Sequence, residues 1–264
     1  MSGQSGDVTE SSLAEAARLL RLSVGDLNRI VGVSQQMPLA RASTLEEADL
    51  VREKLRGLGI QSITVPKKDL QLGAAAKRIR ALDFTEDSLT VILAGSGGKI
   101  SARWEEVTLI VAGRLFLSRV EVEENKRRRR LQLVNKREFS SDESVLDIYT
   151  TLDKVNWRII ANNFDFSCLG SAKAAIAFEN FSALVALLRQ CATNARYDDS
   201  YTQLRQALAS VWPLEQQVRK DEGRRGSARK FDVATVTTTD NEPQFTRYSR
   251  LRHCLRHREL PDRK

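Results

Sequence analysis

Apolar residues recur at spacings of three and four near the start of the chain, which is the period of an amphipathic helix. A first helix is predicted after the capping box Ser12-x-x-Glu15, in which each side chain bonds the other residue's backbone. A second helix is predicted to begin at Ser23 and to end at Gly32, because glycine is favoured at a helix C-terminus. The pattern therefore predicts a pair of packed helices.

Between residues 37 and 66 the pattern changes from strand to helix and back to strand. MPLARA predicts a short strand, Ser43-x-x-Glu46 predicts the start of a helix, and a β-branched run that Pro66 ends predicts a second strand. The segment LEEADLVREKLRGLGIQSITV resembles the small ferredoxin-like βαβ modules of prokaryotic signal-transducing proteins. We therefore expect residues 10–72 to form an αα-βαβ module.

Alternation of apolar and polar residues dominates from Lys77 to Leu169 and predicts a series of β-strands. Among them we expect strands at 145–149, 157–161 and 164–168. A strongly amphipathic helix follows, and its apolar stripe consists of Phe178, Phe181, Leu184, Val185 and Leu188. This stripe is expected to pack against the preceding strands.

The stretch WRIIANNFDFSCL, followed by FENFSALVALLRQ, has the order of a last strand pair running into a terminal helix. In this respect the chain resembles the pleckstrin-homology-like (PH-like) superfold, and the resemblance covers residues 75–195. It implies an antiparallel β-barrel that a C-terminal helix caps at one end. We therefore predict an α+β protein in which two folded modules are followed by helical and basic C-terminal extensions.

The remaining chain divides into a helical extension at residues 196–213 and a basic tail at 214–264. Within the tail, RKDEGRRGSARK is typical of an exposed linker, an edge strand is expected at 235–239, and a final helix is expected at 243–258. The apolar stripe of that helix consists of Phe245, Tyr248, Leu251 and Leu255. We favour docking of this stripe on the protein's own domains, because a free stripe promotes association. The alternative is docking on a partner.

Positive charge is concentrated toward the C-terminus. The 264 residues have a formal net charge of +8, and residues 214–264 carry 13 Lys or Arg against 8 Asp or Glu, a balance of +5. If the final helix docks on its own protein, its arginines are expected to face outward as a basic ridge. This ridge is a candidate contact surface for an anionic partner, and it consists of Arg247, Arg250, Arg252 and Arg256.

The densest run of charge lies at the expected tip of a hairpin, and it consists of Lys126, Arg127, Arg128, Arg129 and Arg130. Such a tip can bind phosphate groups. It can also be a solvated hairpin end that opposes the association of sheet edges. Glutamates just before the run, between Glu121 and Glu124, reduce the local positive field. Both interpretations stay open, and the tip is a second candidate site for an anionic partner.

Residues typical of catalysis or cofactor binding are scarce. The only histidines are His253 and His257, and the chain lacks the nucleophile-elbow, phosphate-loop and HExxH patterns. The glycine cluster AGSGGK fits a hairpin turn, and the two histidines with Cys254 are too few ligands for a structural zinc ion. We therefore predict a protein that is not an enzyme and needs no metal or cofactor. An enzymatic alternative would rest on Asp147, Asp153 and Asp165.

The cellular setting is predicted from what the sequence lacks. The first dozen residues contain no basic residue and no apolar run, and no segment approaches the roughly 20 apolar residues of a spanning helix. Three cysteines without a C-x-x-C pair fit a reducing compartment. We expect a bacterial cytoplasmic adaptor or regulatory protein that binds another protein. The alternative is a nucleic-acid-binding accessory protein that uses the tail and the tip, and the oligomeric state stays open.

Overall fold

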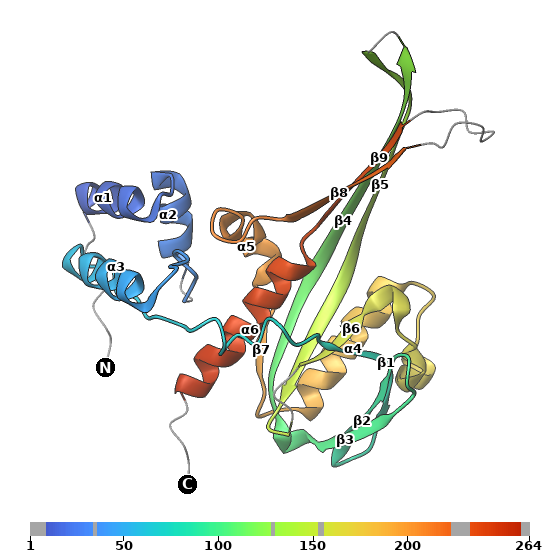
Figure 1. Cartoon of the computed structure of the whole chain (residues 1–264). Coiled ribbons are helices and arrows are strands. Elements are labelled where there is room, and N and C mark those ends of the chain that lie inside the picture. The colour runs from blue at the N-terminus through green and yellow to red at the C-terminus, as the bar shows by residue number, and fades with distance from the viewer. Residues whose placement is uncertain (1–8, 34–35, 128–129, 153–155, 223–232, 260–264) are drawn as a thin grey trace. The chain divides into compact units, whose positions relative to one another are not determined.

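The computed structural model describes residues 9–33, 36–127, 130–152, 156–222 and 233–259. The chain divides into two compact units, and each is described here by itself (Figure 1). The first consists of Met1–Leu70 with Gln203–Pro213, and the second consists of Gln71–Thr202 with Leu214–Lys264. Helix α5, Tyr201–Leu208, therefore begins in the second unit and continues into the first.

Capped helices form the N-terminal part of the first unit: α1 Glu10–Leu20, α2 Val24–Val31 and α3 Leu45–Gly57. The predicted start of α2 is confirmed to within one residue, because Ser23 is the N-cap and its hydroxyl accepts a hydrogen bond from the Asp26 backbone N–H at 3.0 Å. The caps of the other two helices differ from the prediction. Thr9 caps α1, and Thr44 caps α3. The apolar faces meet in a small core that contains Ala16, Ala17, Leu20, Leu27, Leu55 and Ile60.

The two strands predicted on either side of α3 are wrong. Residues 37–42 and 60–65 form no strand. Leu39 and Ile60 instead pack against the helical core. The physical reason is that β-branched composition favours an extended chain only where a neighbouring strand satisfies its backbone hydrogen bonds. Over its described residues, the first unit is therefore helical.

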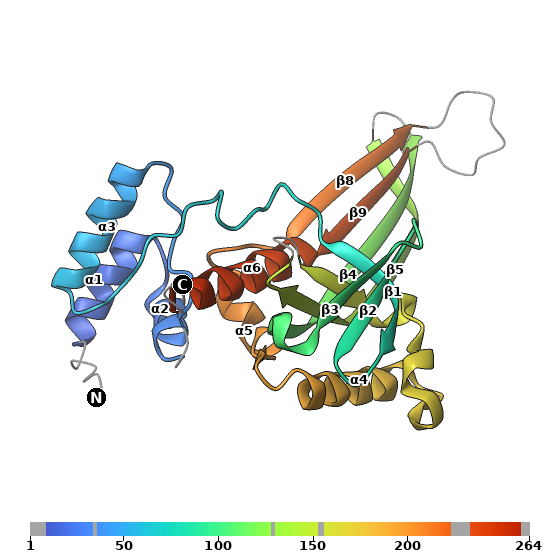
Figure 2. The same ribbon diagram turned by 90° about the horizontal axis from the view of Figure 1, so that it is seen from below.

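The second unit is built on one curled sheet that forms a half-barrel (Figures 1 and 2). Its strand order is β3-β2-β1-β6-β5-β4-β9-β8, and β7 pairs with the first part of β4. The strands are β1 Lys77–Phe84, β2 Ser88–Leu93, β3 Lys99–Arg103, β4 Val107–Arg127, β5 Arg130–Thr150, β6 Trp157–Ile160, β7 Arg196–Asp198, β8 Glu215–Glu222 and β9 Val233–Asp240. The α+β class is confirmed. The prediction of a purely antiparallel barrel is wrong, because β1 pairs with β6, and β4 with β7, in parallel.

The longest elements of the sheet are β4 and β5, which span 21 residues each and pair antiparallel. Their ladder begins with Val107 opposite Thr150 and ends with Arg127 opposite Arg130. The described strands on either side of the basic run therefore pair up to Arg127 and Arg130, which agrees with the predicted hairpin. Figure 1 shows the outer parts of both strands, together with β8 and β9, extending beyond helices α4 and α6 of the same unit.

The C-terminal region contributes more to the sheet than the sequence predicts. The segment expected as a linker begins within β8, which pairs with β9 from Glu215 opposite Asp240 to Glu222 opposite Val233. The strand expected at 235–239 is β9, an internal strand, and β8 is the edge. Charged residues are compatible with β8 because an edge strand exposes its side chains and one line of backbone groups to water.

The prediction of a strand at 164–168 is wrong, although the alternating apolar residues of this segment are buried as a strand would bury them. Phe164 and Phe166 are both buried. The backbone instead enters the 3-10 helix η3, Phe166–Ala172, because Asp165 accepts a hydrogen bond from the Ser167 backbone N–H at 3.0 Å. Such a local side-chain cap competes with strand pairing for the same backbone groups.

Two helices cover opposite faces of the sheet. Helix α4, Ala177–Cys191, covers one face, and Phe181 and Leu188 are buried beneath it as predicted. Helix α6, Glu242–Glu259, lies on the other face, where its Phe245 approaches Gly113 of β4 so closely that an added Cβ would lie 2.7 Å from the ring. The absence of a side chain at Gly113 therefore allows α6 to pack closely against the sheet.

Candidate functional site

The stripe of α6 docks on its own protein, as predicted. Phe245, Tyr248, Leu251 and Leu255 are all buried. The ring of Phe245 meets Tyr201 edge-on, with 5.0 Å between the ring centroids. In addition, the Tyr248 hydroxyl donates a hydrogen bond to Asp198 at 2.9 Å, and burial raises the pKa of this phenol. These contacts fix α6 against the sheet.

The prediction that the arginines of α6 face outward as a basic ridge is wrong for Arg250 and Arg252. Their exposed fractions are only 5% and 7%. Arg250 donates hydrogen bonds to the carbonyls of Gln71 and Ala74, and Arg252 Nε lies 2.6 Å from Asp198 Oδ2. A buried cation requires such partners, because desolvation is costly. Neither side chain is available to an anionic partner.

The other two ridge residues also have internal partners. Arg247 Nη2 lies 3.1 Å from Glu215 Oε1, and Arg256 Nη2 donates to the Asn194 carbonyl at 3.2 Å. Both side chains are partly buried. Within the described chain, α6 therefore presents a packed surface rather than a line of solvated arginines.

A buried ion pair that the sequence analysis missed joins β5, β6 and α6. The guanidinium of Arg158 forms two bonds with the Asp147 carboxylate, from Nε to Oδ1 at 2.7 Å and from Nη2 to Oδ2 at 2.8 Å. Ser249 donates to the same carboxylate, and the Tyr149 hydroxyl lies 2.8 Å from the Ser249 hydroxyl. The available signal is a charged residue in the middle of each apolar strand, VLDIY and WRII. Asp147 thus has a structural role.

The remaining catalytic and metal candidates do not converge. The described residues contain no cluster of His, Cys, Asp and Glu that could hold a metal ion. His253 stacks on Tyr149, with ring centroids 4.2 Å apart. Hydrogen bonds from Ser167 lower the pKa of Asp165, which caps η3. Asp153 and the side chain of His257 lie outside the described residues.

The outer part of the sheet is the first candidate surface, and we call it the arm: residues 117–127 of β4 and 130–142 of β5, together with β8 and β9. Every residue from Lys136 to Asp142 is exposed. Because successive side chains of a strand point to opposite faces, both faces of the arm are open there. Phe139 is 56% exposed. A single exposed apolar side chain is normal on a protein surface, so the candidate interaction surface rests on the open edge of β5 rather than on Phe139.

The outer edge of β5 is open along the arm. Strand β6 pairs only with Val145–Ile148, so in the described structure no strand pairs with the outer side of residues 136–142. The direction of the free backbone groups follows from Phe116, whose N–H and carbonyl both bond Asn241, beyond the end of β9. Phe116 and Asp142 are therefore a non-hydrogen-bonded pair of the β4–β5 ladder. By alternation, residues 136, 138, 140 and 142 direct their N–H and carbonyl groups to the open edge, where the Asp142 carbonyl accepts a hydrogen bond from Arg114 Nη2 at 3.3 Å.

The predicted basic tip lies at the end of the arm, but the structure does not describe it fully. Arg128 and Arg129 lie outside the described residues, and the side chains of Lys126, Arg127 and Arg130 are likewise outside them. The register nevertheless places the end of the second hairpin beside this tip, because Val233 of β9 is opposite both Glu124 of β4 and Glu222 of β8. Both hairpins therefore end on the same side of the sheet.

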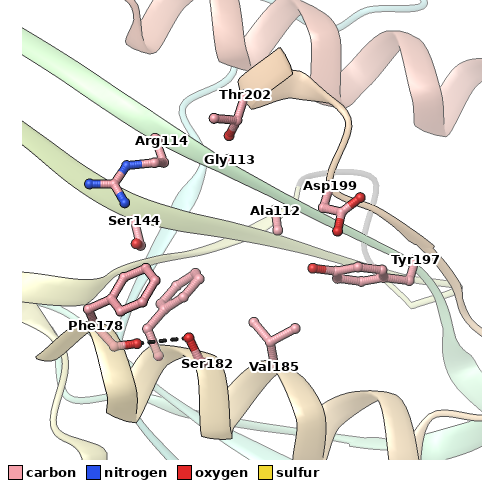
Figure 3. Close-up of a pocket in the computed structure, with 11 residues that line it drawn as sticks. Ala112, Gly113, Arg114, Ser144, Phe178, Ser182, Val185, Tyr197, Asp199 and Thr202 are labelled. Carbon is pink, nitrogen blue, oxygen red and sulfur yellow. Dashed lines mark hydrogen bonds between the residues drawn. The ribbon is translucent and has the colours of Figure 1, made fainter. Parts of the chain in front are cut away.

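A pocket between α4 and the sheet is the second candidate site, with a volume of about 410 Å³ (Figure 3). The small side chains of Ala112 and Ser144 leave space beneath the helix. The walls are completed by residues of β4, α4, β7 and the start of α5 with the residue between them: Gly113, Arg114, Phe178, Phe181, Ser182, Val185, Tyr197, Asp199 and Thr202. Apolar walls with a few polar groups are typical of small-molecule sites.

The polar groups of the pocket have defined surroundings. Arg114 Nε lies 3.1 Å from Asp142 Oδ2, and its guanidinium lies 5.9 Å from the centre of the Phe178 ring. Burial, followed by the nearby charge of Asp199, raises the pKa of Tyr197 to about 12. The phenol is therefore a neutral hydrogen-bonding group at physiological pH.

Comparisons of the chain with protein-family models, curated proteins and solved structures find no match. Among the described helices, no single one is long and apolar enough to cross a bilayer; η3 and α4 reach that length and composition only as a pair bent by 88°. The function is therefore argued from the arm and the pocket.

Proposed function

We propose that this protein is a non-enzymatic adaptor that binds another protein by adding a strand of that partner to the open edge of β5. The observation that carries the proposal is the unpaired outer side of residues 136–142, where alternate N–H and carbonyl groups point away from β4. An added strand would satisfy these groups, and main-chain bonds of this kind give affinity without requiring a deep groove.

The charge of the arm supports a protein partner rather than a polyanion along its length. The described strands, residues 117–127, 130–142, 215–222 and 233–240, carry 8 Lys or Arg against 9 Asp or Glu. A nucleic-acid groove normally has a large cationic excess. A mixed surface instead suits an extended peptide whose own charges alternate.

The side chains of β5 define the chemistry of the partner strand. Arg137 and Phe139 share one face of the arm, whereas Lys136 and Glu138 share the other. We infer a mixed-charge extended segment that places an apolar residue opposite Phe139 and an acidic residue opposite Arg137. On its other face the segment places an acid opposite Lys136 and a base opposite Glu138.

The test uses a proline that removes one outward N–H. Ser140→Pro should weaken binding of peptides selected from a random dodecapeptide library by at least about tenfold, whereas Ser140→Ala keeps the N–H and should bind like the natural chain. Proline at this edge position removes no bond between β4 and β5, so the arm should stay folded. Hydrogen exchange should also show peptide-dependent protection of the amides of residues 138, 140 and 142. Peptides that bind both variants equally well would contradict strand addition.

A second candidate, nucleic-acid binding by the end of the arm, is favoured by the shared position of the two hairpin ends. Residues 126–130 carry five Lys or Arg and no acid. If they neutralise phosphates, the affinity for a 20-nucleotide single strand should fall linearly with the logarithm of the salt concentration, and replacing all five with Gly and Ser should flatten that slope. A slope that the replacement leaves unchanged would exclude the tip as the phosphate contact.

A further inference from the structure

The pocket beneath α4 is a separate site from the open edge of β5, although Arg114 of the pocket bonds Asp142 at the inner end of that edge. The pocket is an open depression between a helix and a sheet, and its volume of about 410 Å³ lies in the range of small-molecule sites. The space exists because Ala112 and Ser144 are small where α4 crosses β4 and β5. Phe178 stands at the pocket with 57% of its surface exposed, so a ligand would cover an aromatic ring that is now in water.

Charged and polar groups lie at two ends of the pocket, and between them Ser182 of α4 donates its hydroxyl hydrogen bond to the Phe178 carbonyl (Figure 3). At one end are Arg114 and Ser144. The guanidinium of Arg114 contacts Asp142 through Nε and donates from Nη2 to the Asp142 carbonyl at 3.3 Å. A guanidinium has five N–H donors, so further donors stay available for a carboxylate.

At the other end are Tyr197 and Asp199. Burial and the nearby charge of Asp199 raise the pKa of the phenol, and Asp199 is exposed. In the described structure no Lys or Arg pairs with Asp199. This end therefore offers hydrogen-bond acceptors, whereas the Arg114 end offers donors. Between the two ends, the wall is apolar and consists of Phe178, Phe181 and Val185.

We propose that this pocket binds a small aromatic carboxylate that carries a hydrogen-bond donor at the end of its ring remote from the carboxylate. The carboxylate binds Arg114 and the Ser144 hydroxyl, since a guanidinium matches a carboxylate in geometry and charge. The ring lies against Phe178 and Val185, where aromatic contacts add to the burial of apolar surface. The remote donor binds Asp199, whose carboxylate accepts it.

The experiment is an NMR titration of the full chain with three probes: 4-hydroxyphenylacetate has all three features, phenylacetate lacks the donor, and 4-methylphenol lacks the carboxylate. 4-Hydroxyphenylacetate should bind most tightly and should shift the amide signals of residues 112–114, 182–185 and 197–199. Arg114→Gln should weaken its binding by about tenfold or more, the usual effect of losing a charge-assisted hydrogen bond. Arg119→Gln is the matched control, because Arg119 lies on the same strand, pairs with Glu121 and is outside the pocket. It should bind like the natural chain.

Two further variants separate a real site from a surface effect. Asp199→Asn should remove most of the preference for 4-hydroxyphenylacetate over phenylacetate, and Val185→Trp should abolish binding of both by filling the space. The proposal is overturned if 4-hydroxyphenylacetate produces no shifts at these residues up to 10 mM, or if Arg114→Gln and Arg119→Gln bind it equally. Because Ser140→Pro leaves all pocket residues in place, failure of this proposal is distinguishable from failure of strand addition.

Discussion

The arginines of α6 and those of the arm have opposite surroundings. Arg250 and Arg252 are buried and bonded to groups far away in the chain. Arg119 and Arg137 are exposed, and the ion pair of Arg119 is with Glu121, two residues along its own strand. The difference teaches that a basic run becomes a contact surface or a structural anchor according to whether acids and carbonyls from distant segments reach it.

The sharpest test of this comparison removes one acid from the buried ion pair of β5 and β6, which α6 covers, and one from an exposed ion pair on the arm. Asp147→Ala leaves the buried Arg158 without its main partner and should lower the free energy of unfolding by about 3–5 kcal/mol. Glu138→Ala removes an exposed partner of Lys136 on the arm and should cost less than about 1 kcal/mol. Urea unfolding measures both. Equal losses would mean that the two regions do not differ as described.

A smaller effect is expected when the cations themselves are changed. Arg252→Gln removes the charge beside Asp198, which keeps hydrogen bonds from Tyr248 and from the Ser200 N–H, so the cost should be about 1.5–3 kcal/mol. Arg137→Gln on the arm should change stability by no more than about 0.5 kcal/mol. Thermal unfolding of the two variants provides the comparison. A destabilised Arg137→Gln would show that Arg137 has a structural partner.

The packing of α6 against β4 can be tested with a substitution that changes no charged residue. Gly113→Ala places a methyl group 2.7 Å from the Phe245 ring, and the resulting overpacking should cost about 1–3 kcal/mol. Gly73→Ala is the control, since an added Cβ there has no atom within 4 Å. Hydrogen exchange of α6 should rise in the first variant alone. Unchanged exchange in Gly113→Ala would mean that the helix is not held at this point.

The smallest effect is expected at the tip of the arm. Replacing residues 126–130 with Gly and Ser should change the free energy of unfolding by less than about 0.5 kcal/mol, because five consecutive cations cannot be buried without partners. The midpoint of urea unfolding measures this. A large loss of stability would reveal that the run pairs with acids inside the folded chain.

Features set by local physics could be predicted from the sequence. The cap at Ser23, the burial of Phe181 and the position of the tip all depend on residues close in the chain. The stripe of α6 was also predictable, because helical periodicity defines which side chains share a face. Helical periodicity does not predict which part of the protein the apolar stripe packs against.

Features set by distant segments could not be predicted. The bond between Asp147 and Arg158 was signalled only by a charge within each apolar strand, and β8 was hidden by its polar composition. Residues 37–42 and 60–65 have strand-like composition but form no strand, whereas β8 has linker-like composition but finds β9. Of the candidate sites, only the cations of the tip could be recognised in the sequence. The open edge of β5 and the pocket could not, because each depends on where neighbouring strands and helices end in the folded structure.

The alternation of β4 has a consequence for how the length of the arm can vary. Ala112 faces the pocket, Gly113 faces α6, and the same strand continues without a break into the arm. Deleting one residue from the outer part of β4 would exchange the two faces of everything beyond it, whereas deleting two from each strand would preserve them. Insertions and deletions that keep both faces therefore change the length in steps of roughly 7 Å, two residues of a strand. The length of the arm can therefore change by mutation in steps of two residues per strand, without any change in the core of the second unit.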